Sequence, residues 1–233
     1  MAATHLERLG DYQRRFADSL GEIDPDLPIP TCGDWTARDL ALHLADIYTW
    51  AARRAGGPKV RLEPGDDLVA HYRTAASVLF TTLSELDPDE PCWTLLDDDR
   101  PAEEPRVGTR AFWHRRQALE TMVHLWDLRT PAGLVTEFSP DEWWDCADEV
   151  VTVMQPRQVR LGRTAPPEVR VVLTSGEAEE LVVDAAEASA PTVRVSGTAE
   201  QLALLLWGRR SAADLDVDGD RDALAAALKG IVP

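Results

Sequence analysis

The chain has 233 residues, of which 44% are hydrophobic and 28% charged, as is ordinary for a protein with a buried core. Its formal net charge of −17 excludes nucleic acid and anionic membranes as main partners, because both require clustered cations. No apolar run approaches the roughly 20 residues that span a membrane, and the chain opens without a signal peptide pattern. An odd count of 3 cysteines without such a signal favours a reducing compartment, so we expect a cytoplasmic protein.

Helical patterns fill the first two-thirds of the chain. Apolar residues recur at helical spacing from Ala3 to Leu20. A second helix is expected to run to about Arg54, with either Asp34 or Thr36 as its N-cap. Further helices are expected over about 66–86 and 109–129, and another begins where Ser139 and Pro140 supply a cap and a first-turn proline.

Between the third and fourth predicted helices lies an acidic, proline-rich segment, residues 87–108. It is longer than an ordinary connection between helices. Two interpretations stay open from the sequence: a functional loop, or a loosely ordered one.

The sequence pattern changes near residues 163–167. Beyond it come short β-branched runs, then two more helical segments, at 169–173, 181–183, 192–195, 199–207 and 221–229. This order predicts an α+β protein with two domains. We expect a helical bundle over residues 1–158 and a small α+β domain over residues 166–233.

Five chemically reactive side chains fall on two of the predicted helices. Glu120 and His124 are four residues apart and share a helix face, with Arg116 and Asp127 one turn to either side, and His43 comes from the second helix. Two imidazoles and a carboxylate can hold a catalytic divalent metal with one position open. Asp127 would orient an imidazole, and Arg116 would hold Glu120 or a substrate carboxylate. The same spacing is also common in surface pairs, so spacing alone leaves both interpretations open.

The residues around these side chains resemble a known family. PTCGDWTARDLALHLA (30–45) and WHRRQALETMVHLWD (113–127) are similar to the two halves of the signature of the mycothiol-dependent maleylpyruvate isomerase family. VSGTAEQLALLLWGR (195–209) is similar to its C-terminal domain. The resemblance implies a DinB-like four-helix bundle followed by a small SCP2-like α+β domain. It also implies a divalent metal, usually zinc, at His43, Glu120 and His124. It further implies mycothiol as cosubstrate.

The resemblance further implies that an arginine of the C-terminal domain reaches the catalytic cleft, and Arg209, after Gly208, is the best match. There it would contact the cosubstrate or a carboxylate-bearing substrate. The alternative is that Arg209 and Arg210 only complement the dipole at a helix C-terminus.

These residues predict a metal-dependent enzyme that uses mycothiol on a small molecule. A metal deprotonates a bound thiol, and the thiolate can isomerise a conjugated double bond or displace a leaving group. The alternatives are a metal-dependent hydrolase and a non-catalytic metal- or ligand-binding protein. The chain's own cysteines, Cys32, Cys92 and Cys146, are poor candidates for the nucleophile because none has a neighbouring histidine in the sequence. We expect a monomer or a homodimer.

Overall fold

The computed structural model describes residues 3–101, 103–176 and 180–232. The chain divides into two compact units, Met1–Thr136 and Glu137–Pro233. We expected the first domain to extend to residue 158, but the helix that begins at Pro140 lies in the second unit. The reason is that this helix packs against a later helix of the second unit, a long-range contact that helical periodicity does not reveal.

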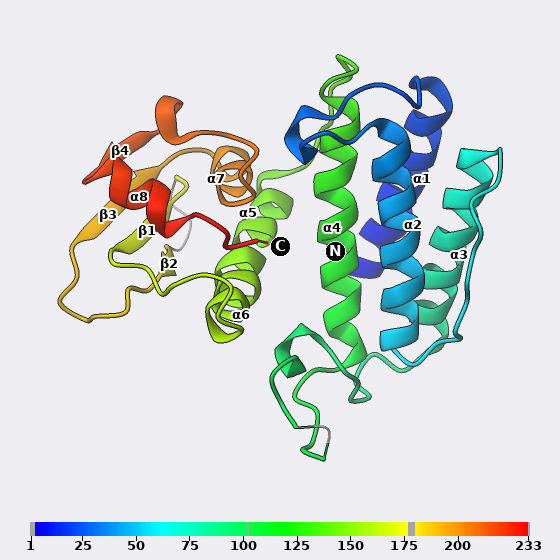
Figure 1. Ribbon diagram of the computed structural model, residues 1–233, viewed down its shortest axis with the longest axis horizontal. Helices are drawn as coiled ribbons and strands as arrows, with labels where there is room; N and C mark the ends of the chain where they lie inside the picture. Colours follow the sequence, from blue (N-terminus) through cyan, green and yellow to red (C-terminus); the bar gives the residue numbers. More distant parts are fainter. Residues whose placement is uncertain (1–2, 102, 177–179, 233) are drawn as a thin grey trace. The chain divides into compact units, whose positions relative to one another are not determined.

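Over the described residues, the first unit is a bundle of four long helices that lie side by side (Figure 1). The first helix packs on the third and fourth, and the second helix also packs on the third and fourth. The helices are α1 (His5–Glu22), α2 (Ala37–Arg54), α3 (Leu68–Glu85) and α4 (Arg110–Arg129), with a short 3₁₀ turn, η1 (Pro30–Cys32), before α2.

Local hydrogen bonds fix where α2 begins. The Thr36 hydroxyl accepts from the backbone N–H of Asp39, and the Asp39 carboxylate accepts from the backbone N–H of Thr36. Thr36, and not Asp34, is therefore the N-cap, in a capping box that satisfies otherwise unpaired amides. Because α2 starts here, His43 lies two turns into the helix.

Helix α4 has polar as well as apolar side chains in the interior. Arg116, Gln117, Thr121, His124 and Asp127 are all buried. Buried polar groups require partners, so a helix with this many polar side chains inside a bundle indicates an internal polar network.

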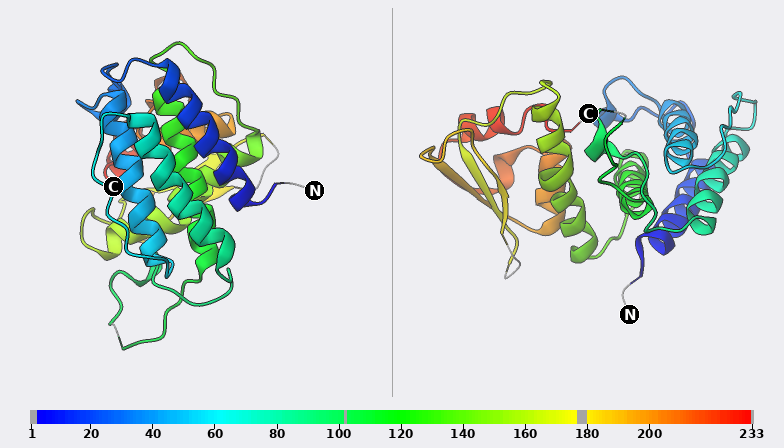
Figure 2. Two further views of the ribbon diagram at one scale, coloured as in Figure 1. Left: turned by 90° about the vertical axis from the view of Figure 1, so that its right-hand side faces the viewer. Right: turned by 90° about the horizontal axis from the view of Figure 1, so that it is seen from below.

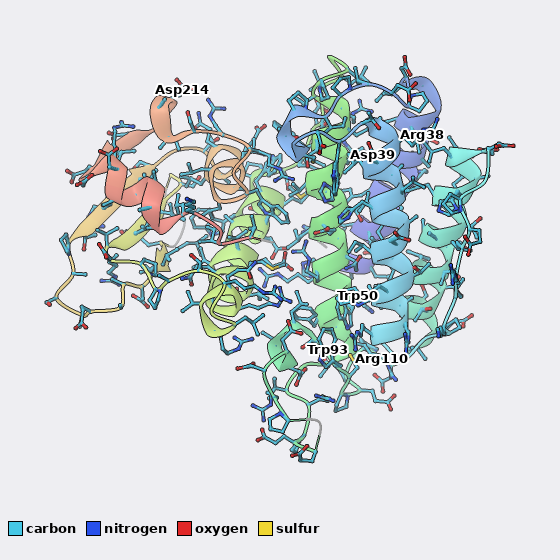
Figure 3. The ribbon with its side chains drawn as sticks, in the orientation of Figure 1. Arg38, Asp39, Trp50, Trp93, Arg110 and Asp214 are labelled. Carbon is cyan, nitrogen blue, oxygen red and sulfur yellow. The ribbon has the colours of Figure 1, made fainter. Side chains whose placement is uncertain are left out.

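The acidic segment between α3 and α4 is anchored to the end of the bundle and carries a 3₁₀ turn, η2 (Leu95–Asp97). Trp93 stacks with Trp113 at a centroid distance of 6.2 Å, and its carbonyl accepts from the Trp113 indole N–H. Figure 3 shows Trp50, Trp93 and Arg110 gathered at this end of the bundle. Where it is described, the segment is therefore an ordered loop.

The second unit combines helices with a sheet whose order is β2-β1-β3-β4 over the described residues. The two central strands, β1 and β3, are parallel, and each edge strand pairs antiparallel with its neighbour. In Figure 2, α5 and α7 lie on the same side of the sheet, in mutual contact. The helical elements are α5 (Pro140–Glu149), the π-helical turn η3 (Val150–Met154), α6 (Gln155–Arg160), α7 (Ala199–Leu206), η4 (Ala212–Asp214) and α8 (Arg221–Ala227). The strands are β1 (Arg170–Thr174), β2 (Leu181–Val183), β3 (Thr192–Ser196) and β4 (Asp216–Asp218).

The fold class predicted from the sequence, a helical bundle followed by a small α+β unit, is confirmed. None of the helices in the described part of the chain has the length and hydropathy needed to cross a membrane.

Candidate metal centre

Three side chains from α2 and α4 converge on one point. Glu120 Oε1 lies 3.5 Å from His43 Nε2 and 3.4 Å from His124 Nε2. Ligand atoms about 2.0–2.1 Å from a tetrahedral ion are about 3.3 Å from one another, so these two separations fit ligands of one ion, and the donor atoms of all three residues lie within 4.8 Å of one another. Imidazole nitrogen and carboxylate oxygen are also donors that zinc and similar divalent metals accept. The three residues therefore fit the group that the sequence predicted.

The two carboxylate oxygens of Glu120 have different partners. Oε1 faces the two imidazoles, while Oε2 accepts a hydrogen bond from the Arg116 guanidinium, whose side chain is only 4% exposed. Burial by itself would raise the pKa of Glu120, but Arg116 and the two histidines hold it well below its ordinary value. Glu120 is therefore anionic, with one oxygen directed at the convergence point.

His124 lies between two carboxylates. Its Nδ1 is 3.0 Å from Asp127 Oδ2, on the side of the ring away from Glu120. A carboxylate only accepts, so Nδ1 carries the hydrogen and the opposite nitrogen faces Glu120. Burial would lower the pKa of His124, but the hydrogen bonds to Asp127, Cys32 and Glu120 raise it well above its ordinary value. A metal at Nε2 would therefore compete with a proton for that nitrogen.

His43 forms the more accessible side of the site. Its side chain is 29% exposed, against 14% for Glu120 and 6% for His124. The indole of Trp35 lies beside the His43 ring at a centroid distance of 4.9 Å, and the rings of His43 and His124 meet edge to face. His43 is therefore the most solvent-accessible of the three residues.

A second group of donor atoms shares His124. Cys32, His124 and Asp127 also place one donor atom each within 4.8 Å of one another. These atoms are already joined by hydrogen bonds, since the Cys32 thiol donates to Asp127 Oδ2 at 3.5 Å. The Asp127 carboxylate already takes part in hydrogen bonds to Thr31, Cys32 and His124. We therefore interpret Cys32 and Asp127 as residues that position His124, and not as a second metal site.

The structure brings together five of the six predicted site residues: His43, Arg116, Glu120, His124 and Asp127. The sixth, Arg209, lies in the second unit, where its guanidinium donates to the Trp207 carbonyl and lies over the Trp207 ring. Its role in the site stays a prediction.

Sequence reasoning missed Thr31 and Cys32, both hydrogen-bonded to Asp127. They belong to the stretch that carries the resemblance, but only their position just before the His43 helix hinted at the site. Nothing in the sequence shows that this turn reaches across to α4.

Comparisons with known proteins bear on the family and the fold of the chain. Residues 6–129 match the family model of the mycothiol maleylpyruvate isomerase N-terminal domain, and residues 137–226 match that of the C-terminal domain of the same family. The second match begins where the second compact unit begins, at residue 137. The comparison with curated proteins gives no match.

Among solved structures, the chain is similar to a crystal structure of the mycothiol-dependent maleylpyruvate isomerase, with a TM-score of 0.61 and 15% identity over 93% of this chain and 94% of that one. A variant of that enzyme with one histidine replaced by alanine gives a TM-score of 0.60 and 16% identity over the same shares. At this identity the likeness shows the shared fold.

Proposed function

Because the chain belongs to the mycothiol maleylpyruvate isomerase family, we propose that it is a metal-dependent isomerase that uses mycothiol as its thiol cosubstrate. The substrate class that we propose is a small carboxylate with a conjugated double bond, of which maleylpyruvate is the member named by the family. The observation that carries the proposal is the convergence of His43, Glu120 and His124, in a chain matched by both domain models.

A divalent metal held by His43, Glu120 and His124 would lower the pKa of a bound thiol and so supply thiolate at neutral pH. The chain's own residues prepare the site for it. Arg116 keeps Glu120 ionised and turns one of its oxygens toward the imidazoles. Asp127 holds the Nδ1–H of His124, so that Nε2 faces the ion. Trp35 lies beside the partly exposed His43 ring.

Mycothiol would supply a thiolate that adds to one alkene carbon of the substrate, permits rotation about the former double bond and leaves again as the double bond reforms. The thiol would therefore act as a catalyst, with no net consumption.

A substrate carboxylate requires a cation, and Arg209 is our candidate. Guanidinium binds carboxylate in a bidentate manner, and Arg209 lies just after the end of α7 in the second unit. One of its contacts, the hydrogen bond to the Trp207 carbonyl, is to a neutral acceptor that a carboxylate can replace. We expect Arg209→Ala to reduce turnover and to leave metal content unchanged.

The test combines metal analysis with turnover. Protein purified without chelators is analysed for metal, then incubated with maleylpyruvate with and without mycothiol, and the geometry of the product is read by NMR. We expect about one divalent metal per chain and isomerisation only with mycothiol. His43→Ala and His124→Ala should lose both metal and turnover. His71→Ala, which removes a partly buried histidine of α3 outside the site, is the matched control and should keep both.

Other outcomes would overturn the proposal in distinct ways. A stable thioether that consumes mycothiol would indicate an S-transferase. Hydrolysis without mycothiol would indicate a hydrolase, and bound metal without turnover of conjugated carboxylates would indicate a binding protein. Equal metal content in His124→Ala and the unsubstituted protein would overturn the metal site itself. The expected cytoplasmic location and the expected monomer or homodimer stay predictions.

A further inference from the structure

The carboxylate of Asp127 is fully buried and connects α4 to the turn before α2. Its Oδ2 faces His124 Nδ1 at 3.0 Å, and its Oδ1 accepts a hydrogen bond from the Thr31 hydroxyl at 2.6 Å. The Cys32 thiol donates to Oδ2 at 3.5 Å. The Thr31 bond is short, as expected for a hydroxyl that donates to a carboxylate.

The turn that carries Thr31 is itself fixed by backbone hydrogen bonds. The N–H of Cys32 donates to the Ile29 carbonyl, and the N–H of Ile29 donates to the Trp35 carbonyl, both at 2.8 Å. The chain then reverses at Gly33, whose φ of 73° is a conformation that favours glycine. Thr31 therefore presents its hydroxyl from a defined position and not from a mobile loop.

We propose that Thr31 is a positioning residue that acts through Asp127 on His124. The inference rests on the proposed metal site at His43, Glu120 and His124. A carboxylate that holds a ligating imidazole must itself be held, because rotation about its own side-chain bonds would turn the imidazole away from the ion. Thr31 binds the oxygen that His124 does not use, so it fixes the carboxylate plane while leaving Oδ2 to the imidazole.

The same turn also leads directly into α2, the helix that carries His43. Thr31 therefore connects the segment that presents one imidazole to the helix that presents the other. Cys32 has a smaller part, because a thiol is a weak donor and its sulfur is 3.5 Å from the carboxylate. The expected order of importance for metal affinity is Asp127, then Thr31, then Cys32.

Thr31→Val, which keeps the side-chain shape and removes the hydroxyl, tests the inference. Metal affinity is measured by competition with a chromophoric zinc chelator, on protein with its fold checked by circular dichroism. We expect Thr31→Val to weaken zinc binding about 10-fold, in the range typical of residues behind a metal ligand. Thr31→Ser, which keeps the hydroxyl, should restore affinity to within about 3-fold of the unsubstituted protein. A second readout needs no metal: the Nδ1–H proton resonance of His124, which reports its hydrogen bond to Asp127, should shift in Thr31→Val and not in Thr31→Ser.

Thr74→Val is the matched control, since the Thr74 hydroxyl on α3 donates only to a backbone carbonyl in its own helix and lies outside the site. It should bind zinc as the unsubstituted protein does. Unchanged zinc affinity and an unchanged His124 resonance in Thr31→Val would overturn the inference. Equal losses of zinc affinity in Thr31→Ser and Thr31→Val would also overturn it. Both results would leave the proposed function in place. Failure of the unsubstituted protein to bind zinc would instead overturn the proposed metal site, and the inference with it.

Discussion

Glu120 divides its two oxygens between a cation and a pair of imidazoles, and this division depends on Arg116. Both side chains are largely buried, at 4% exposure for Arg116 and 14% for Glu120. The net stability of a buried ion pair is small, but removal of one partner leaves a charge in a poorly solvated place. Arg116 therefore supports the site in the folded protein even before any ligand binds.

Arg116→Met should lower the free energy of unfolding of metal-free protein by about 3 kcal/mol, because Glu120 loses its strongest positive partner. Adding Glu120→Gln to that variant should recover part of the loss, since the buried charge is then gone. Urea denaturation of the two single variants and the double variant measures the coupling. If the losses of unfolding free energy in the two single variants add up to the loss in the double variant, Arg116 and Glu120 are not coupled. Arg14→Met, which breaks an exposed ion pair with Asp11, is the control and should change stability by less than about 1 kcal/mol.

At the scale of elements, the acidic segment is organised around one buried carboxylate. Asp97 is 1% exposed and accepts hydrogen bonds from the backbone N–H groups of Val107 and Thr94 and from the Thr94 hydroxyl. Burial raises the pKa of Asp97, but these hydrogen bonds outweigh it and leave the pKa below its ordinary value. The Asp97 carboxylate therefore links Thr94 and Val107, which lie on the two sides of this loop.

Asp97 should therefore make stability depend on pH in acid. Its folded-state pKa is lower than the unfolded value of about 3.9, so it stabilises the fold above that pH, and the contribution is lost as pH falls through the folded-state pKa. Asp97→Asn should cost about 2 kcal/mol at pH 7 and less at pH 3, below the unfolded-state pKa. Urea denaturation at both pH values measures the difference. The exposed Asp89→Asn is the control, and a cost for Asp97→Asn that does not shrink in acid would contradict the assignment.

The helices were predictable from the sequence because their signals are local. The capping boxes at Thr36 and at Ser139 and the 3.6-residue spacing of apolar side chains need only neighbouring residues. Strand β4 was missed because Asp216–Asp218 is short and acidic, and only its pairing with β3 makes it a strand. The contact of Cys32 with Asp127 joins residues 95 apart, which no local pattern encodes.

At the scale of the whole molecule, the proposed metal ligands and their supports all come from the first unit. His43 lies on α2, Glu120, His124 and Asp127 lie on α4, and Thr31 precedes α2. The second unit contributes Arg209 as a candidate substrate residue. Metal binding is therefore predicted to need only residues of the first unit.

A fragment of residues 1–136 should bind zinc within about 10-fold of the affinity of the whole chain, because no proposed ligand or support is lost. It should isomerise substrate more slowly than the whole chain, since Arg209 is absent. Competition with a zinc chelator and the NMR turnover assay measure the two properties separately. His124→Ala in the same fragment is the control for nonspecific binding. A folded fragment that binds no zinc would contradict the division of roles, as would one that retains full turnover.

Arg116 also sets the charge balance of the centre. With both imidazoles neutral, Glu120 and Asp127 bring two negative charges and Arg116 brings one positive charge, so these residues together carry a single negative charge. A divalent cation among them leaves one positive charge uncompensated in a mostly buried place. A monovalent anion makes the assembly electroneutral, whereas an uncharged ligand does not. With the proposed metal bound, this charge balance would favour an ionised sulfur ligand over a protonated one, and replacing Arg116 with a neutral side chain would remove that preference.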